Sequence, residues 1–213
     1  MGKTSDRLLR GLITLTHETL GLTPNQISAA GFVAGVIAAL LVALGFLVYG
    51  LVTMALGQVI DGLDGGVARR YHLQSKKGRL LELVYDRLSE LLMFLALVYA
   101  GLVSQSIAIL AFVAILLVTA VEPWSHFDPG FKRFMIYFGY LASTIFQVRG
   151  FEAAMHVIFF ANLAGFAVGT IIADYQLQRE IDHQAIVRRA AEQAMGVPEL
   201  PVDSPSFLSR LFS

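Results

Sequence analysis

Hydrophobic residues fill long runs of this chain, and short polar stretches separate them. The longest runs reach the roughly 20 residues that an α-helix needs to cross the hydrocarbon of a membrane. The pattern predicts six transmembrane helices, at residues 27–49, from 51 through the polar stretch that follows residue 60, and at 80–102, 107–121, 134–146 and 154–174. We place the turn between the first two at Gly50. The predicted fold class is an all-α integral membrane protein with six spans.

The composition supports this fold class. Of 213 residues, 56% are hydrophobic and 15% are charged, which leaves too little polar surface to cover a soluble globule of this size. The formal net charge is zero, so we expect no nucleic-acid partner. The chain has no cysteine, which excludes thiolate catalysis and cysteine-ligated zinc.

The two ends of the chain differ from its apolar middle. Residues 1–26 carry apolar positions at helical intervals among charges, which predicts an amphipathic helix at the membrane interface; an ordinary solvated lead-in is the alternative. This helix should stop before Thr23-Pro24-Asn25, because the residue before a proline disfavours helix. Residues 175–213 predict a polar helix to residue 195, a Pro-rich linker and the apolar stretch SFLSRLF. The predicted domains are therefore 1–26, a membrane domain at 27–174 and a tail at 175–213.

Basic residues indicate the orientation of the spans. Of the 16 Lys and Arg residues, only Arg149 falls on one side of the predicted topology. Both termini, the turn at 69–79 and the pair Lys132-Arg133 share the other side. Basic connections are typical of the cytoplasmic side, so we expect both termini and the acids described next to be cytoplasmic, in the plasma membrane of a prokaryote.

Four acidic residues lie within residues 61–86, where a membrane sequence should exclude charge. Asp61 and Asp64 are three residues apart, and Glu82 and Asp86 are four apart, so each pair shares one helix face. A basic, glycine-containing turn separates the pairs, and antiparallel helices would bring all four carboxylates together at one membrane surface. Carboxylates beside glycines and arginines predict a metal and phosphate site. A structural ion-pair network is the alternative for Asp61 and Asp64.

The same stretch resembles the signature of the CDP-alcohol phosphotransferase family, D-x2-D-G-x2-A-R-x8-G-x3-D-x3-D. The signature positions in this chain are Asp61, Asp64, Gly65, Ala68, Arg69, Gly78, Glu82 and Asp86. Seven of the eight match, and only Glu82 departs, where the family has Asp. The resemblance extends to Thr23-Pro24-Asn25 and to the six-helix layout, over about residues 5–175.

The resemblance implies a function in phospholipid synthesis. Family members transfer a phosphatidyl-type group from a CDP-linked donor to the hydroxyl of an acceptor alcohol and release CMP. It implies that Asp61, Asp64, Glu82 and Asp86 hold two Mg²⁺ or Mn²⁺ ions, and that Asp86 is the general base. It further implies that donor phosphate and nucleotide bind at the residues Asp61, Gly65, Ala68, Arg69 and Gly78. A homodimer is expected from the family, and membrane lipids are expected around it.

Glu82 leaves three outcomes open. The longer side chain reaches the same metals after a small helix shift, or the enzyme prefers another ion or runs slowly, or the protein is a non-catalytic relative that binds CDP ligands or acts as a dimeric scaffold. We adopt the first as the working interpretation because Asp86 and Arg69 are intact.

The acceptor side is less constrained. Lys132 and Arg133 lie on the side of the acids and would hold a phosphate or anionic headgroup of the acceptor, in a pattern similar to relatives that use inositol phosphate. Alternatively, Lys132 and Arg133 only mark the cytoplasmic side of the membrane, as other basic residues do. Glu90 either supports the site from behind or pairs with Arg87.

Overall fold

Helices make up all the regular structure in the part of the chain that the structure describes. The structure is a computed structural model, and it describes the backbone of residues 10–195 and the side chains of residues 11–188. The elements in chain order are α2 (Arg10–Thr14), the π-helical turn η1 (Leu15–Thr19), α3 (Pro24–Ala43), α4 (Leu47–Arg70), α5 (Lys76–Tyr99), α6 (Gln105–Ser125), α7 (Lys132–Phe146) and α8 (Gly150–Met195). The all-α prediction is confirmed. Residues 1–9 of the predicted interfacial helix and the Pro-rich linker with SFLSRLF lie outside the described residues.

Four of these helices are long and apolar enough to cross a membrane, and they are α3, α4, α6 and α8 as far as Arg188. The chain is therefore a multi-pass membrane protein by length and composition. The remaining predicted spans correspond to α5 and α7. The first half of α5 carries Lys, Arg, Glu and Asp, which lowers its hydropathy, and α7 has only 15 residues.

The start of α3 follows from its first residues. Thr23 precedes the helix with extended backbone, and Pro24 occupies the first helical position, where a missing N–H costs nothing. The Gln26 N–H donates to Thr23 Oγ1 at 3.4 Å, and the Thr23 N–H donates to Gln26 Oε1 at 2.9 Å, so the two residues form a capping box. The predicted break in the chain at Thr23-Pro24-Asn25 is confirmed.

The turn between α3 and α4 is not at Gly50, and that prediction is wrong. Gly45 makes the turn, with a φ of 88° that other residues rarely adopt. Gly50 lies inside α4, where a Cβ would sit 2.5 Å from Val42 Cγ2 and 2.9 Å from the Ala38 carbonyl oxygen. Its lack of a side chain therefore lets α3 and α4 pack closely.

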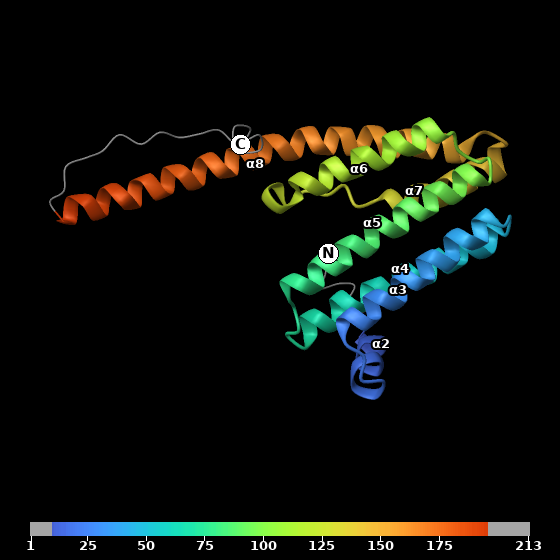
Figure 1. Cartoon of the computed structure of the whole chain (residues 1–213), viewed down its shortest axis with the longest axis horizontal. Helices are drawn as coiled ribbons and strands as arrows, with labels where there is room; N and C mark the ends of the chain where they lie inside the picture. Colours follow the sequence, from blue (N-terminus) through green and yellow to red (C-terminus); the bar gives the residue numbers. More distant parts are fainter. Residues whose placement is uncertain (1–9, 196–213) are drawn as a thin grey trace.

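The last predicted span and the predicted tail helix form one element. α8 runs from Gly150 to Met195 without a break, so no turn separates residue 174 from residue 175. In Figure 1 the C-terminal part of α8 extends beyond the other helices.

The helices form two groups that meet at α5. In Figure 1 α3 and α4 lie side by side, α6 and α8 do so on the other side of the molecule, and α5 crosses between them. α7 packs on α8. The main core joins the two groups through fully buried residues such as Ala38 of α3, Leu97 of α5 and Ile115 of α6.

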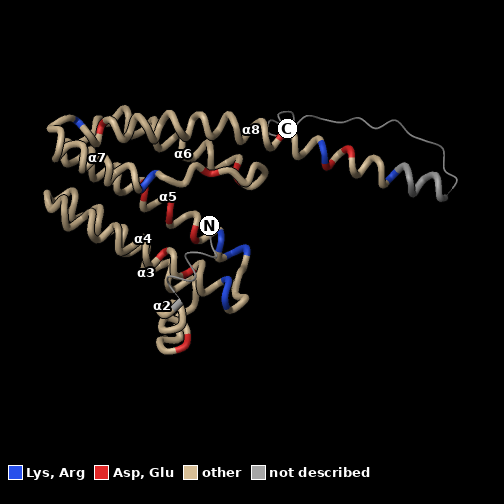
Figure 2. Tube along the Cα trace, turned by 180° about the vertical axis from the view of Figure 1, so that it is seen from behind, with Lys and Arg blue, Asp and Glu red and all other residues tan. Residues whose placement is uncertain are grey.

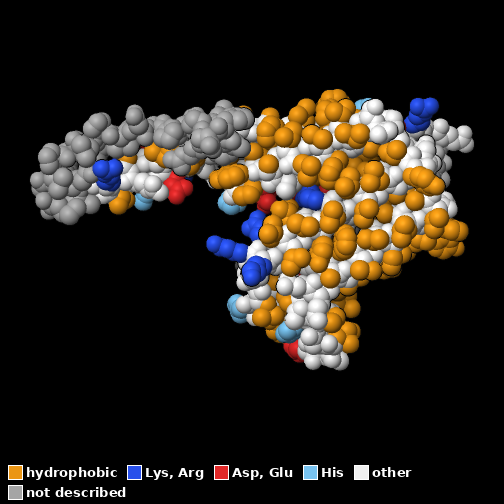
Figure 3. Space-filling view, viewed as in Figure 1, with side chains coloured by type: hydrophobic (Ala, Val, Ile, Leu, Met, Phe, Trp, Pro, Cys, Tyr) orange, Lys and Arg blue, Asp and Glu red, His pale blue; other side chains and the backbone are white. Residues whose placement is uncertain are grey.

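The outer surface of this bundle is hydrophobic. Figure 3 shows one face covered mainly by apolar side chains, with basic side chains gathered at one edge. Large apolar residues on four helices are more than half exposed, among them Leu40 at 57%, Leu56 at 58%, Phe138 at 59% and Ile171 at 71%. A soluble protein rarely exposes so large an apolar surface, whereas lipid tails would cover it.

Candidate active site

The two predicted acid pairs lie on α4 and α5, one pair on each helix. Figure 2 shows acidic residues along these two helices, with basic residues at the turn that joins them. Asp61 is close enough to Asp86 for the two charges to interact. Asp64 interacts in the same way with the charges of Asp61 and Glu82. The structure therefore brings all four carboxylates into one cluster, as the helical spacing predicts.

Asp64 is the most buried of the four acids, with 3% of its surface exposed. Ser28 of α3 donates a hydrogen bond from its hydroxyl to Asp64 Oδ2. The other carboxylate oxygen, Oδ1, is buried and has no hydrogen-bond partner in the structure. An unpartnered buried carboxylate oxygen is costly, and a bound cation would satisfy it.

A cavity of about 470 Å³ opens beside Asp64, between the first turns of α3 and the turn that joins α4 to α5. Five of the residues predicted to bind metal, nucleotide or donor phosphate line it together with Asp64, and they are Gly65, Ala68, Arg69, Gly78 and Glu82. Asp61, predicted for the same role, does not line this cavity but lines a different one, together with Asp86 and Arg133. The predicted donor-site residues are thus largely adjacent in space.

The two glycines of this cavity have little room for a side chain. A Cβ on Gly65 would lie 3.0 Å from the Nη1 atom of Arg69. A Cβ on Gly78 would lie 3.0 Å from Ser75 Oγ and 3.1 Å from Asn25 Oδ1. The glycines therefore keep the cavity open and leave Arg69 in place.

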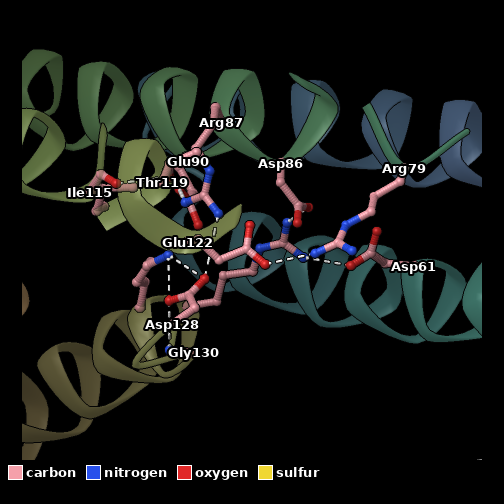
Figure 4. Close-up of polar contacts among 12 residues, drawn as sticks. Asp61, Arg79, Asp86, Arg87, Glu90, Ile115, Thr119, Glu122, Asp128 and Gly130 are labelled. Atoms are coloured by element: carbon pink, nitrogen blue, oxygen red, sulfur yellow. Dashed lines mark hydrogen bonds and ion pairs between the residues drawn. The ribbon is translucent and has the colours of Figure 1, made fainter. Parts of the chain in front are cut away.

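Arg133 connects the first and last acids of the motif. Its Nη1 atom donates to Asp61 Oδ2 at 3.3 Å, and its Nη2 atom donates to Asp86 Oδ1. Figure 4 shows Asp61 and Asp86 approaching from α4 and α5 with these bonds dashed between them. Arg133, predicted as an acceptor-binding residue, thus contacts the predicted metal ligand and the predicted base directly.

A second charged group lies beside it. Asp128, in the connection before α7, accepts bonds from Lys132 Nζ at 3.0 Å and from the Gly130 N–H at 3.0 Å, and Arg87 lies 3.8 Å away. Arg87 also pairs with Glu90 at 2.5 Å, so the interpretation of Glu90 as a partner of Arg87 is confirmed. Figure 4 shows the two side chains next to each other.

The surroundings of Asp128 favour its charged form. Burial raises the pKa of this carboxyl, but the nearby Lys132 ammonium, the hydrogen bonds from Lys132 and Gly130 and the Arg87 charge outweigh burial and lower the pKa below its ordinary value. Lys132 itself is buried, with 4% of its surface exposed, whereas the Asp128 side chain is 35% exposed.

Two further cavities adjoin the acids, and Asp64 lines neither of them. One of about 340 Å³ is bounded by Asp61, Asp86, Arg87, Asp128, Lys132 and Arg133, among others. The other, of about 510 Å³, is bounded by Glu82, Asp86 and Arg87 together with Arg79 and Glu122, which pair at 2.9 Å. Asp86 borders both cavities, and each of them is lined by acidic and basic side chains together.

The carboxylates suit a divalent metal by their chemistry, although they are not arranged as a metal site here. Among the described residues no three His, Cys, Asp or Glu side chains converge closely enough to hold an ion. Asp61 and Asp86 are instead bonded to Arg133. Oxygen donors of this kind are what Mg²⁺ and Mn²⁺ prefer, and the unpartnered Asp64 Oδ1 is an available ligand atom.

Two residues at the site were not predicted from sequence. Ser28 gives no signal of its own, although it lies one helical turn after Pro24, beside the Thr23-Pro24-Asn25 motif. Asp128 is the second of these residues. Its position four residues before Lys132 is the spacing of an ion pair on one helical turn and would have indicated the contact.

Comparison with known proteins identifies the family. The model of the CDP-alcohol phosphatidyltransferase family matches residues 21–172, and the chain belongs to that family. It is 32% identical over 98 residues to the archaetidylinositol phosphate synthase of Pyrococcus horikoshii, which is 46% of this chain and 52% of the relative. It is 41% identical over 58 residues to the inner membrane protein YnjF of Escherichia coli, or 27% of this chain and 28% of the relative. The chain thus spans about half the length of the first relative and about a quarter of the second.

Solved structures share the fold. The phosphatidylinositol phosphate synthase PgsA1 of Mycobacterium tuberculosis, solved with CDP-DAG bound, superimposes with a TM-score of 0.63 at 18% identity, over 79% of this chain and 92% of that chain. The same enzyme solved with manganese and citrate gives a TM-score of 0.63 at 18% identity, over 79% of this chain and 88% of that chain. At this identity the likeness concerns the fold.

Proposed function

We propose that this chain is a membrane enzyme that transfers a phosphatidyl-type group from a CDP-linked lipid donor to the hydroxyl of an acceptor alcohol and releases CMP. The observation that carries the proposal is the cluster of four motif acids beside a cavity lined by Gly65, Ala68, Arg69 and Gly78, within a chain of this family. A reaction in phospholipid synthesis follows from this donor and product.

The donor would bind in the cavity beside Asp64. Arg69 lines this cavity beside Gly65, and its guanidinium would pair with a donor phosphate. Gly65, Ala68 and Gly78 would leave space for the nucleotide, and Asp61 would contact it from the neighbouring turn of α4. The CDP-DAG bound to PgsA1 supports a CDP-linked lipid as the donor.

Asp61, Asp64, Glu82 and Asp86 would hold Mg²⁺ or Mn²⁺, in a two-metal site. Bound there, the ions would neutralise negative charge on the diphosphate of the donor. The burial of Asp64 and the bond from Ser28 fix one ligand before any ion arrives. The manganese in PgsA1 supports a metal of this class.

Asp86 would act as the general base. It borders the 340 Å³ and the 510 Å³ cavities, so an acceptor hydroxyl placed in either can meet its carboxylate. Asp86 would take the hydroxyl proton as the oxygen attacks the donor phosphorus, and the P–O bond to CMP would break. Arg133 contacts Asp86 and would hold its carboxylate in place until the acceptor arrives.

The acceptor would be anionic, and Lys132 and Arg133 would bind it. Both residues line the 340 Å³ cavity with Asp86. The names of two relatives, archaetidylinositol phosphate synthase and phosphatidylinositol phosphate synthase, support inositol phosphate as the acceptor class.

The membrane arrangement is part of the proposal. α5 and α7 would complete six spans, with the charged half of α5 inside the bundle and α2 lying at the interface. Both termini and the acids would face the cytoplasm, at the plasma membrane of a prokaryote, and the positive-inside pattern supports this orientation. A homodimer surrounded by membrane lipids is expected.

A non-catalytic relative that binds CDP ligands or serves as a scaffold is the alternative, and Glu82 is its motivation. CMP release separates the two. The purified protein, given CDP-diacylglycerol or CDP-archaeol with inositol phosphate and other acceptors, is expected to release CMP with Mn²⁺ and to stop with EDTA. Binding of the CDP-lipid without release under every acceptor would favour the scaffold.

A further inference from the structure

The side chain of Arg133 joins parts of the molecule that otherwise pack separately. α7, which carries it, packs mainly on α8, whereas Asp61 lies on α4 and Asp86 on α5. The guanidinium bonds Asp61 through its Nη1 atom and Asp86 through its Nη2 atom. A single cation therefore lies between the first and the last acid of the motif.

These charges are partly shielded from water. The side chains of Arg133, Asp61 and Asp86 are 23%, 31% and 27% exposed. Two carboxylates held close together at such burial repel each other unless a cation separates them. Arg133 supplies that cation. Its guanidinium stays protonated, so the positive charge is lost from the two carboxylates only if the side chain moves away.

The neighbouring cations are engaged elsewhere. Lys132 bonds Asp128, and Arg87 bonds Glu90 and lies near Asp128. Arg133 is thus the cation of this cavity whose bonds go to the motif acids.

We propose that Arg133 is an internal counter-cation that competes with a divalent metal for Asp61 and Asp86, so that metal binding requires the guanidinium to leave these oxygens. The inference rests on the proposed function, because it concerns the metal that function needs. Both cations need the same carboxylate oxygens, and they repel each other at that distance.

The competition couples the metal to the acceptor. The 340 Å³ cavity lined by Arg133 and Lys132 gives the displaced guanidinium a place beside the acceptor. An anion there holds Arg133 away from Asp61 and so favours the metal, and by linkage the metal favours the anion equally. Arg133 is in this sense a positioning residue: the metal and the anionic acceptor each bind more tightly when the other is bound.

Metal affinity tests the proposal directly. Free Mn²⁺ is measured by electron paramagnetic resonance while the full chain in detergent is titrated, as the parent, Arg133→Gln, Arg133→Lys and the control Arg70→Gln. Arg70 is exposed at the end of α4 and lies over the Tyr71 ring, so its variant removes one charge from the same end of the molecule. Arg133→Gln is expected to bind Mn²⁺ roughly fivefold tighter or more, a typical coupling between sites. Arg70→Gln should match the parent.

Thermal unfolding gives a second readout that does not depend on turnover. Arg133→Gln in EDTA should melt below the parent, because Asp61 and Asp86 then repel each other, and Mn²⁺ should raise its melting temperature by more than it raises that of the parent. Arg133→Lys keeps the positive charge but cannot bond both carboxylates through two separate nitrogens. Its Mn²⁺ affinity should therefore lie between that of the parent and that of Arg133→Gln.

Two results overturn the proposal. If the parent binds Mn²⁺ and Arg133→Gln binds it no more tightly, the competition is refuted while the proposed function stands. If neither binds Mn²⁺, the competition and the metal-dependent function fall together. Should Arg133→Gln not fold, equal Mn²⁺ affinity of Arg133→Lys and the parent refutes the competition.

Discussion

Ser28 of α3 hydrogen-bonds the buried carboxylate of Asp64 on α4, and this bond ties the first span to the motif. The Ser28 hydroxyl also lies 3.1 Å from the Pro24 carbonyl oxygen, within the first turn of α3. The Thr23-Pro24 helix start thus determines where the hydroxyl lies and, through it, how Asp64 is oriented. The helix break at Thr23-Pro24-Asn25 and the acid motif are therefore linked through Ser28.

Removing this hydroxyl should weaken both stability and metal binding. Ser28→Ala removes the hydroxyl bonded to Asp64 Oδ2, and Oδ1 is already a buried oxygen without a hydrogen-bond partner. We expect a loss of about 1–3 kcal/mol of unfolding free energy and roughly ten- to hundredfold weaker Mn²⁺ binding. Thr144→Ala, which removes an exposed hydroxyl bonded within its own helix at 2.9 Å, is the matched control. Unchanged Mn²⁺ affinity in Ser28→Ala would show that the bond does not support the site.

A methyl group at Gly65 should impair donor binding. Its Cβ would lie 3.0 Å from Arg69 Nη1 and would displace the guanidinium from the cavity. Losing one charge-assisted bond to phosphate costs about 1.5–3 kcal/mol, which raises the KM for the CDP-lipid roughly ten- to hundredfold. Gly11→Ala on α2 is the control, because nothing lies within 4 Å of a Cβ there. A normal KM in Gly65→Ala would place the donor phosphate elsewhere.

The pKa of Asp128 predicts a pH dependence of stability. Because Lys132, Gly130 and Arg87 hold this pKa below its ordinary value despite burial, the charged carboxylate stabilises the folded state above the ordinary pKa of about 3.9. This stabilisation is lost as the pH falls through the lower folded pKa. Asp128→Asn should therefore melt below the parent at pH 7, and the difference should shrink in acid.

Melting curves in detergent between pH 7 and pH 3 check this prediction. Asp182→Asn, at an exposed position of α8, serves as the control and should follow the parent at every pH. A gap between Asp128→Asn and the parent that stays constant down to pH 3 would mean that the charge of Asp128 contributes nothing.

The sequence predicts the motif well because the relevant relations are local. The spacing of Asp61 with Asp64 and of Glu82 with Asp86 fixes which residues share a helix face, and two antiparallel helices then bring the pairs together. The start of α3 is equally local, since Thr23, Pro24 and Gln26 contain its whole cap.

Other features depend on packing and escape the sequence. Apolar residues continue across Gly45 and Gly50 alike, so hydropathy does not show which glycine turns the chain; close packing of Gly50 on Val42 decides it. The contact of Arg133 with Asp61 joins residues 72 positions apart and depends on how α7 lies against α4 and α5. A basic pair at a helix start is otherwise the common sign of membrane orientation.

Release of CMP by the parent, Asp86→Asn and Glu82→Asp tests the central claim most directly. With Mn²⁺, CDP-lipid and inositol phosphate, the parent should turn over, and Asp86→Asn should lose on the order of 100-fold or more in kcat, because the acceptor hydroxyl then lacks its base. Glu82→Asp should keep activity, since Asp at this position is the usual residue of the motif. A parent that releases no CMP while Glu82→Asp does, or an Asp86→Asn variant as fast as the parent, would contradict the account.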